Sequence, residues 1–122
     1  MAEGGKVLVN LATGLEDSER VMIAFLVAVA ALDDGRDVTL FLTKEAVRLA
    51  LPGYCRGTAC EDCPPLERLF DQFAERGGRI LVCPFCFNGR KLSEDDLVAN
   101  AALGGATPML QWAGNDALVL SY

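Results

Sequence analysis

Two short runs, residues 6–12 and 38–42, are almost wholly apolar. A strand with one face in water alternates apolar and polar side chains, whereas a strand that is covered on both faces does not. Both runs therefore predict central strands of a parallel sheet with helices on either side. Residues 79–82 and 117–121 predict two further strands, and residues 102–106 predict a short one.

Helical segments lie between these strands. An acidic start at Glu16, Asp17 and Glu19 suits the positive end of a helix, which we expect to run to about Leu32. Further helices are predicted over residues 44–51, 66–76, 93–101 and 108–113. Alternating strands and helices indicate a single α/β domain over residues 1–122. Its expected fold is a three-layer α/β/α arrangement with a mainly parallel sheet of four or five strands.

Composition excludes several classes of function. Eleven Lys and Arg against seventeen Asp and Glu give a net charge of −6, which is unfavourable for binding nucleic acid. The chain has no histidine, so Ser-His and Cys-His catalysis is excluded. Gly104-Gly105 lacks the rest of a dinucleotide-binding fingerprint.

The apolar run over residues 21–32 is twelve residues long, whereas about 20 are needed to span a bilayer. We therefore expect no membrane association. The run predicts a buried helix that packs between the sheet and another element or a second subunit. No secretory signal is visible at the start of the chain, so a reducing cytoplasm is the expected location.

Two of the five cysteines, Cys83 and Cys86, follow the third predicted strand directly, and Arg90 lies four residues further on. Reactive groups in parallel α/β folds gather at the carboxyl ends of the strands. Helix-start amide groups and Arg90 would favour a thiolate there. Cys83, Cys86 and Arg90 are thus the predicted catalytic residues of a thiol protein. The alternative is that Cys83 is a small apolar residue at a strand end.

A second pair, Cys60 and Cys63, precedes Cys83 by a spacing that structural zinc sites use. Connectivity brings the loop over residues 52–65 back toward the carboxyl edge, so Cys60, Cys63, Cys83 and Cys86 are candidate metal ligands. One observation opposes zinc. A zinc knuckle usually has glycine near its tight turn, whereas Pro84-Phe85 occupies the turn between Cys83 and Cys86. A dithiol–disulfide switch is a third interpretation of the same cysteines.

Several segments together resemble one family. They are Gly14-Leu15-Glu16-Asp17, the strand Gly-Arg-Asp-Val-Thr-Leu-Phe-Leu at residues 35–42, Gly-Gly-Arg-Ile-Leu-Val-Cys-Pro-Phe-Cys at residues 77–86, Leu-Ser-Glu-Asp-Asp-Leu-Val at residues 92–98, and the last six residues. Over about residues 5–122 the chain resembles the DsrE-like family of small sulfur-relay and uncharacterised α/β proteins.

The resemblance implies an α/β/α domain that forms homo-oligomers, trimers or hexamers. It also implies a cysteine after the third strand that in some members carries sulfur as a persulfide, and this position corresponds to Cys83. Cys86 and Arg90 match positions found in part of the family, whereas the loop with Cys55, Cys60 and Cys63 departs from its pattern.

The expected function is that of a small cytoplasmic, sulfurtransferase-like carrier that exchanges sulfur with donor and acceptor proteins and requires no cofactor. The alternatives are a zinc-stabilised module, a dithiol redox module, and an oligomeric binding protein without catalysis.

Overall fold

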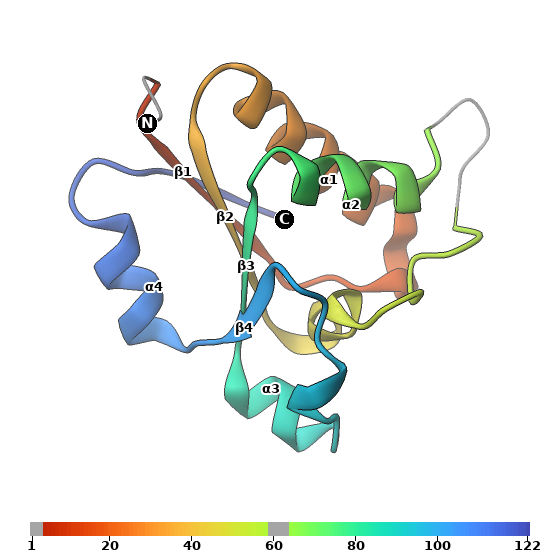
Figure 1. Cartoon of the computed structure of the whole chain (residues 1–122). Coiled ribbons are helices and arrows are strands. Elements are labelled where there is room, and N and C mark those ends of the chain that lie inside the picture. The colour runs from red at the N-terminus through yellow and green to blue at the C-terminus, as the bar shows by residue number, and fades with distance from the viewer. Residues whose placement is uncertain (1–3, 59–63) are drawn as a thin grey trace.

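The computed structural model describes residues 4–58 and 64–122, and within them five parallel strands form one sheet in the order β4-β3-β2-β1-β5 (Figure 1). The strands are β1 (Lys6–Leu11), β2 (Asp37–Leu42), β3 (Arg79–Val82), β4 (Ala101–Leu103) and β5 (Leu118–Ser121). Because all of them run in the same direction, their carboxyl ends meet at one edge of the sheet. The predicted parallel α/β sheet is confirmed.

Helices cover both faces of this sheet. The α-helices are α1 (Ser18–Asp33), α2 (Leu66–Glu75), α3 (Pro84–Gly89) and α4 (Ala106–Ala113), and the segments of 3₁₀ helix are η1 (Leu15–Asp17), η2 (Lys44–Ala50) and η3 (Glu94–Asp96). Figure 1 shows α1 and α2 on one side of the sheet and α4 on the other. This arrangement confirms the three-layer α/β/α fold.

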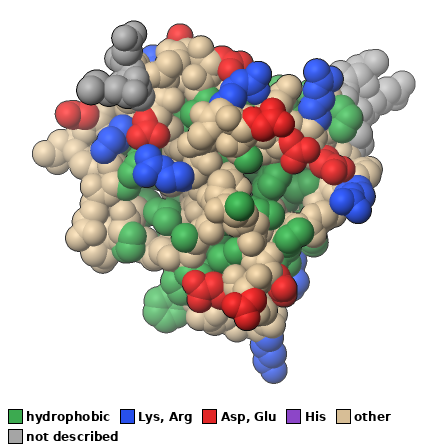
Figure 2. Space-filling view, in the orientation of Figure 1, with side chains coloured by type: hydrophobic (Ala, Val, Ile, Leu, Met, Phe, Trp, Pro, Cys, Tyr) green, Lys and Arg blue, Asp and Glu red, His purple; other side chains and the backbone are tan. Residues whose placement is uncertain are grey.

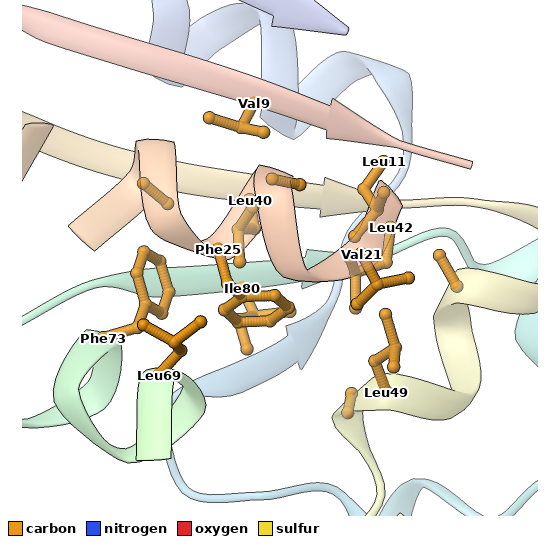
Figure 3. Packing of buried hydrophobic residues seen from close by; sticks show 14 of the residues in the cluster. Val9, Leu11, Val21, Phe25, Leu40, Leu42, Leu49, Leu69, Phe73 and Ile80 are labelled. Atoms are coloured by element: carbon orange, nitrogen blue, oxygen red, sulfur yellow. The ribbon is translucent and has the colours of Figure 1, made fainter. Parts of the chain in front are cut away.

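The larger core lies between the sheet and the pair α1 and α2. Alternate residues of β1, β2 and β3 point into it, because successive side chains of a strand face opposite sides. Phe25 of α1 is fully buried there, and Figure 3 shows it among Leu40, Ile80 and Phe73. Its ring centroid lies 5.7 Å from that of Phe70 and 6.0 Å from that of Phe73.

The opposite face of the sheet has a smaller core. Its buried members are Leu8 and Phe41 from the sheet and Ala113 from α4, which packs over them. Lys6 extends along the edge of this helix, where its Nζ donates to the Trp112 carbonyl oxygen at 2.8 Å and lies 5.2 Å from the Trp112 ring centroid. Figure 2 shows hydrophobic side chains that reach the surface on the side of the molecule that carries α4.

The predicted helix over residues 93–101 is wrong. Only the single turn η3 forms, and Ser93 makes no side-chain hydrogen bond to cap it. The chain is instead held extended by tertiary bonds of its backbone: the Val98 N–H donates to the Ala50 carbonyl, and the Asn100 carbonyl accepts from Ile80 of β3. These bonds outweigh a local helix preference and lead the chain into β4, which begins at Ala101.

Candidate functional site

Cys83 lies at the carboxyl edge of the sheet, where β3 ends and α3 begins. Its N–H donates to the Leu42 carbonyl of β2 at 2.9 Å, and its own carbonyl accepts from the Phe87 N–H of α3 at 3.0 Å. Pro84 follows at the first helical position, where a fixed φ and a missing N–H cost nothing. The main chain therefore fixes Cys83 from both sides, and its side chain is partly exposed.

Cys86 lies one helical turn beyond Cys83, but the two side chains pack in different places. Cys83 packs against the smaller core under α4, whereas Cys86 packs against the larger core. Both are free thiols, and both are partly exposed. The structure therefore brings the two residues into one turn without directing their side chains into the same core.

The start of α4 lies beside the start of α3. The Gly104 N–H donates to the Val82 carbonyl at 3.0 Å, which extends the β3–β4 ladder to the level of Cys83. A Cβ atom on Gly104 would lie 2.9 Å from Leu81 Cδ2, and one on Gly105 would lie 3.7 Å from Pro84 Cδ. Gly104 thus lets the chain pass close to the end of β3, a role that its sequence pattern did not reveal, whereas a side chain at residue 105 would make only an ordinary contact.

Arg90 binds a carboxylate and a main-chain carbonyl. Its Nε donates to Glu45 Oε1 at 2.8 Å, and its Nη1 donates to the Cys86 carbonyl oxygen at 3.1 Å. That Arg90 favours a thiolate stays a prediction. In the structure its guanidinium group pairs with Glu45 and bonds to the main chain of Cys86.

Glu45 is a site residue that sequence reasoning missed. Its second oxygen, Oε2, accepts from Arg48 Nε at 2.8 Å. The hydrogen bonds from Arg90 and Arg48 hold the pKa of the Glu45 carboxyl below its usual value. No local pattern marks this residue, because its partner Arg90 is far away in the sequence and the fold alone joins them.

Two of the four candidate zinc ligands, Cys60 and Cys63, lie outside the described residues. Among residues 4–58 and 64–122, no group of three Cys, Asp or Glu side chains is arranged to bind a metal ion. Cys55, in the same loop, is described, and it packs into the larger core with only 5% of its surface exposed.

Cys55 is expected to resist alkylation in the folded protein. Burial raises the pKa of its thiol to about 12, with a smaller contribution from Glu67 and Asp71. The folded thiol thus stays neutral above pH 9, where the unfolded thiol ionises, so this residue makes the protein less stable as pH rises from about 9 toward 12. Peptide mapping after iodoacetamide treatment should find Cys55 labelled in denaturant and nearly unlabelled without it. Equal labelling in both conditions would contradict its burial.

No helix within the described parts of the chain has the length and apolar character needed to cross a bilayer. α1 is the most apolar of them, and Glu19, Arg20 and Asp33 lie within its sixteen residues.

Comparisons with known proteins agree with this architecture. An uncharacterised protein of Methanopyrus kandleri is 29% identical over 94 residues, which are 77% of this chain and 74% of that protein. An uncharacterised protein of Methanocaldococcus jannaschii is 28% identical over 100 residues, 82% of this chain, and the match spans only 36% of that longer protein. The crystal structure of the ychN protein of E. coli superposes with a TM-score of 0.73 at 23% identity, covering 96% of this chain and 99% of that one.

The family comparison covers nearly the whole sequence. The model of the DsrE/DsrF-like family matches residues 5–122, which include all five strands and the cysteine turn after β3. The chain therefore belongs to the DsrE/DsrF-like family.

Proposed function

We propose that this protein carries sulfane sulfur as a persulfide on Cys83. The observation that supports this most strongly is the placement of Cys83: a partly exposed free thiol at the carboxyl end of a central strand, held by backbone bonds to β2 and α3. This is the edge of a parallel α/β sheet at which reactive groups gather.

The transfer conserves atoms and electrons. The Cys83 thiolate attacks the outer sulfur of a donor persulfide, R–S–SH. The donor S–S bond breaks, a new S–S bond forms to Cys83, and the donor leaves as the thiolate R–S⁻. An acceptor thiolate then attacks the outer sulfur and restores the Cys83 thiolate. Neither step needs an external oxidant or reductant, and neither needs a histidine, which the chain lacks.

Cys86 is the assisting thiol in this proposal. Its thiolate takes the outer sulfur from Cys83, so that the persulfide moves one turn along α3 and Cys83 is regenerated as a thiolate. Because the two side chains pack against different cores, this step requires at least one of them to leave its packed position.

Loading followed by unloading tests the carrier role. The wild-type protein is incubated with a low-molecular-weight persulfide, separated from it and weighed intact. We expect a gain of the mass of one sulfur atom, which a small thiol acceptor then removes. A protein that gains no sulfur, or that keeps it in excess acceptor, is not a carrier.

Zinc binding by Cys60, Cys63, Cys83 and Cys86 is the alternative that sequence spacing favours. The packing of Cys83 and Cys86 against different cores opposes it, because both sulfurs would have to turn toward one ion. Structural four-thiolate sites hold zinc tightly, so metal analysis of protein purified without chelator decides between the two. One zinc per chain supports the alternative, and a trace amount rejects it.

We also propose that the protein self-associates. Apolar side chains remain exposed on both sides of the sheet: Ile23 on α1, which is 41% exposed, and Leu110 on α4, which is 62% exposed. A trimer or a hexamer is the expected assembly. Light scattering coupled to size-exclusion chromatography tests this, and a monomer across the accessible concentrations would refute it.

A further inference from the structure

Glu45 joins three loops at the carboxyl edge of the sheet. It lies in the first turn of η2, directly after β2, and its two oxygens accept from Arg90 and Arg48 separately. Its main-chain oxygen would lie only 2.9 Å from a Cβ atom on Gly14, so the loop after β1 passes against it. The loops that follow β1, β2 and β3 therefore meet at this one residue.

Arg90 connects Glu45 to the cysteine turn. One guanidinium group donates both to Glu45 Oε1 and to the Cys86 carbonyl, and its planar fork fixes these two bonds relative to each other. The carbonyls in the last turn of a helix lack partners within the helix, so a side-chain donor there supplies a hydrogen bond that the helix itself does not. The link runs from η2 through Arg90 to the residue that carries the second thiol.

The helix that carries Cys86 depends on such contacts. α3 has six residues, far fewer than a helix needs to be stable in isolation. Its other anchors are the Phe87 side chain, which is fully buried in the larger core, and the continuity of the main chain with β3. Arg90 and Glu45 hold the opposite end of the helix, where it turns back to solvent.

We infer that Glu45 is a positioning residue for the thiol pair. Acting through Arg90, it holds α3 in the orientation that sets Cys86 relative to Cys83, and Arg48 holds the second carboxylate oxygen of Glu45 in place. The side-chain hydrogen bonds of Glu45 go to Arg90 and Arg48 and to neither thiol, so we assign it no direct part in the chemistry. The consequence for sulfur transfer rests on the proposed function, whereas the effect on the geometry of α3 does not.

The test compares Glu45→Gln with Glu94→Gln. Both replacements remove one carboxylate, but Glu94 forms no ion pair within the described residues, so it serves as the matched control. Each variant is alkylated with iodoacetamide for graded times, and labelling of Cys86, Cys83 and Cys55 is followed by peptide mapping. We expect Glu45→Gln to label Cys86 several-fold faster than wild type, whereas Glu94→Gln matches wild type.

Cys55 separates local loosening from general unfolding. It is buried in the larger core, so it reports opening of the whole domain. Faster labelling at Cys86 with unchanged labelling at Cys55 supports the positioning role. Equal acceleration at both cysteines, or no acceleration at Cys86, overturns it.

Two further variants test whether the geometry of the Arg90 hydrogen bonds, and not only its charge, controls the labelling rate of Cys86. Arg90→Lys keeps the charge but replaces the planar fork with a point charge, so we expect it to label Cys86 as fast as Glu45→Gln. Arg48→Gln leaves the Arg90 bonds in place, so we expect a smaller effect. If Arg90→Lys behaves as wild type, charge alone is sufficient and the positioning role is wrong.

Sulfur loading of the same variants separates the two proposals. If wild-type protein takes up sulfur, Glu45→Gln should speed its movement from Cys83 to Cys86, because a loosened α3 lets Cys86 leave its packed position, and it should leave loading of Cys83 nearly unchanged. If wild-type protein takes up none, the proposed function fails, and the alkylation rates still decide whether Glu45 positions α3. An equal transfer rate in wild type and Glu45→Gln would overturn its part in sulfur transfer.

Discussion

Replacement of Cys83 by serine is expected to abolish uptake of sulfur from a persulfide donor. The oxygen of serine is a far weaker nucleophile at neutral pH than a thiolate and forms no stable persulfide analogue. The substitution changes one atom at a partly exposed position whose main chain is held by bonds to β2 and α3, so the fold should remain. Intact mass after incubation with the donor measures the effect.

Cys86→Ser is the matched control for this result. It makes the same chemical change one helical turn away, in a residue that packs against the other core. Because Cys83 makes the first attack, we expect Cys86→Ser to gain one sulfur atom as wild type does and to pass it on more slowly. Full uptake by Cys83→Ser, together with no uptake by Cys86→Ser, would show that Cys86 and not Cys83 makes the first attack.

Replacement of Phe25 by alanine is expected to lower the free energy of unfolding by about 3–5 kcal/mol, the usual cost of emptying a fully buried phenylalanine site. Phe25 has no exposed surface, and its ring lies against the rings of Phe70 and Phe73 from α2. The cavity would separate α1 from α2 and from the strands beneath them. Urea unfolding followed by circular dichroism measures the change.

Leu26→Ala provides the comparison on the same helix. Leu26 is the next residue of α1 and is 39% exposed, so its removal opens no enclosed cavity. We expect it to cost less than about 1 kcal/mol, because partly exposed side chains away from the core contribute little. Similar losses for the two variants would mean that the aromatic contacts between α1 and α2 do not hold the larger core together.

The central strands could be predicted from the sequence because burial on both faces leaves a strong local signal. The apolar runs over residues 6–12 and 38–42 correspond to β1 and β2, and Arg79–Val82 has the predicted bounds. Strand direction follows from the helices between them, since parallel neighbours need a crossover connection. The position of Cys83 at the carboxyl edge followed from the same reasoning and is confirmed.

What the sequence could not show depends on contacts between distant residues. Residues 93–101 have a good helix start, but bonds from Val98 to Ala50 and from Ile80 to Asn100 keep them extended. The pairing of Arg90 with Glu45 has no counterpart in local spacing. The different packing of Cys83 and Cys86 depends on which core lies beside each of them, and that is decided by the placement of α4 and η2.

The most direct measurement for the carrier proposal is the location of sulfur in the wild-type protein. The protein is loaded briefly with a persulfide donor, its persulfides are trapped with an alkylating reagent, and the trapped sulfur is assigned to a residue by peptide mapping. The account predicts that the extra sulfur is found first on Cys83 and only later on Cys86. Sulfur found first on any other cysteine, or on none, would contradict it.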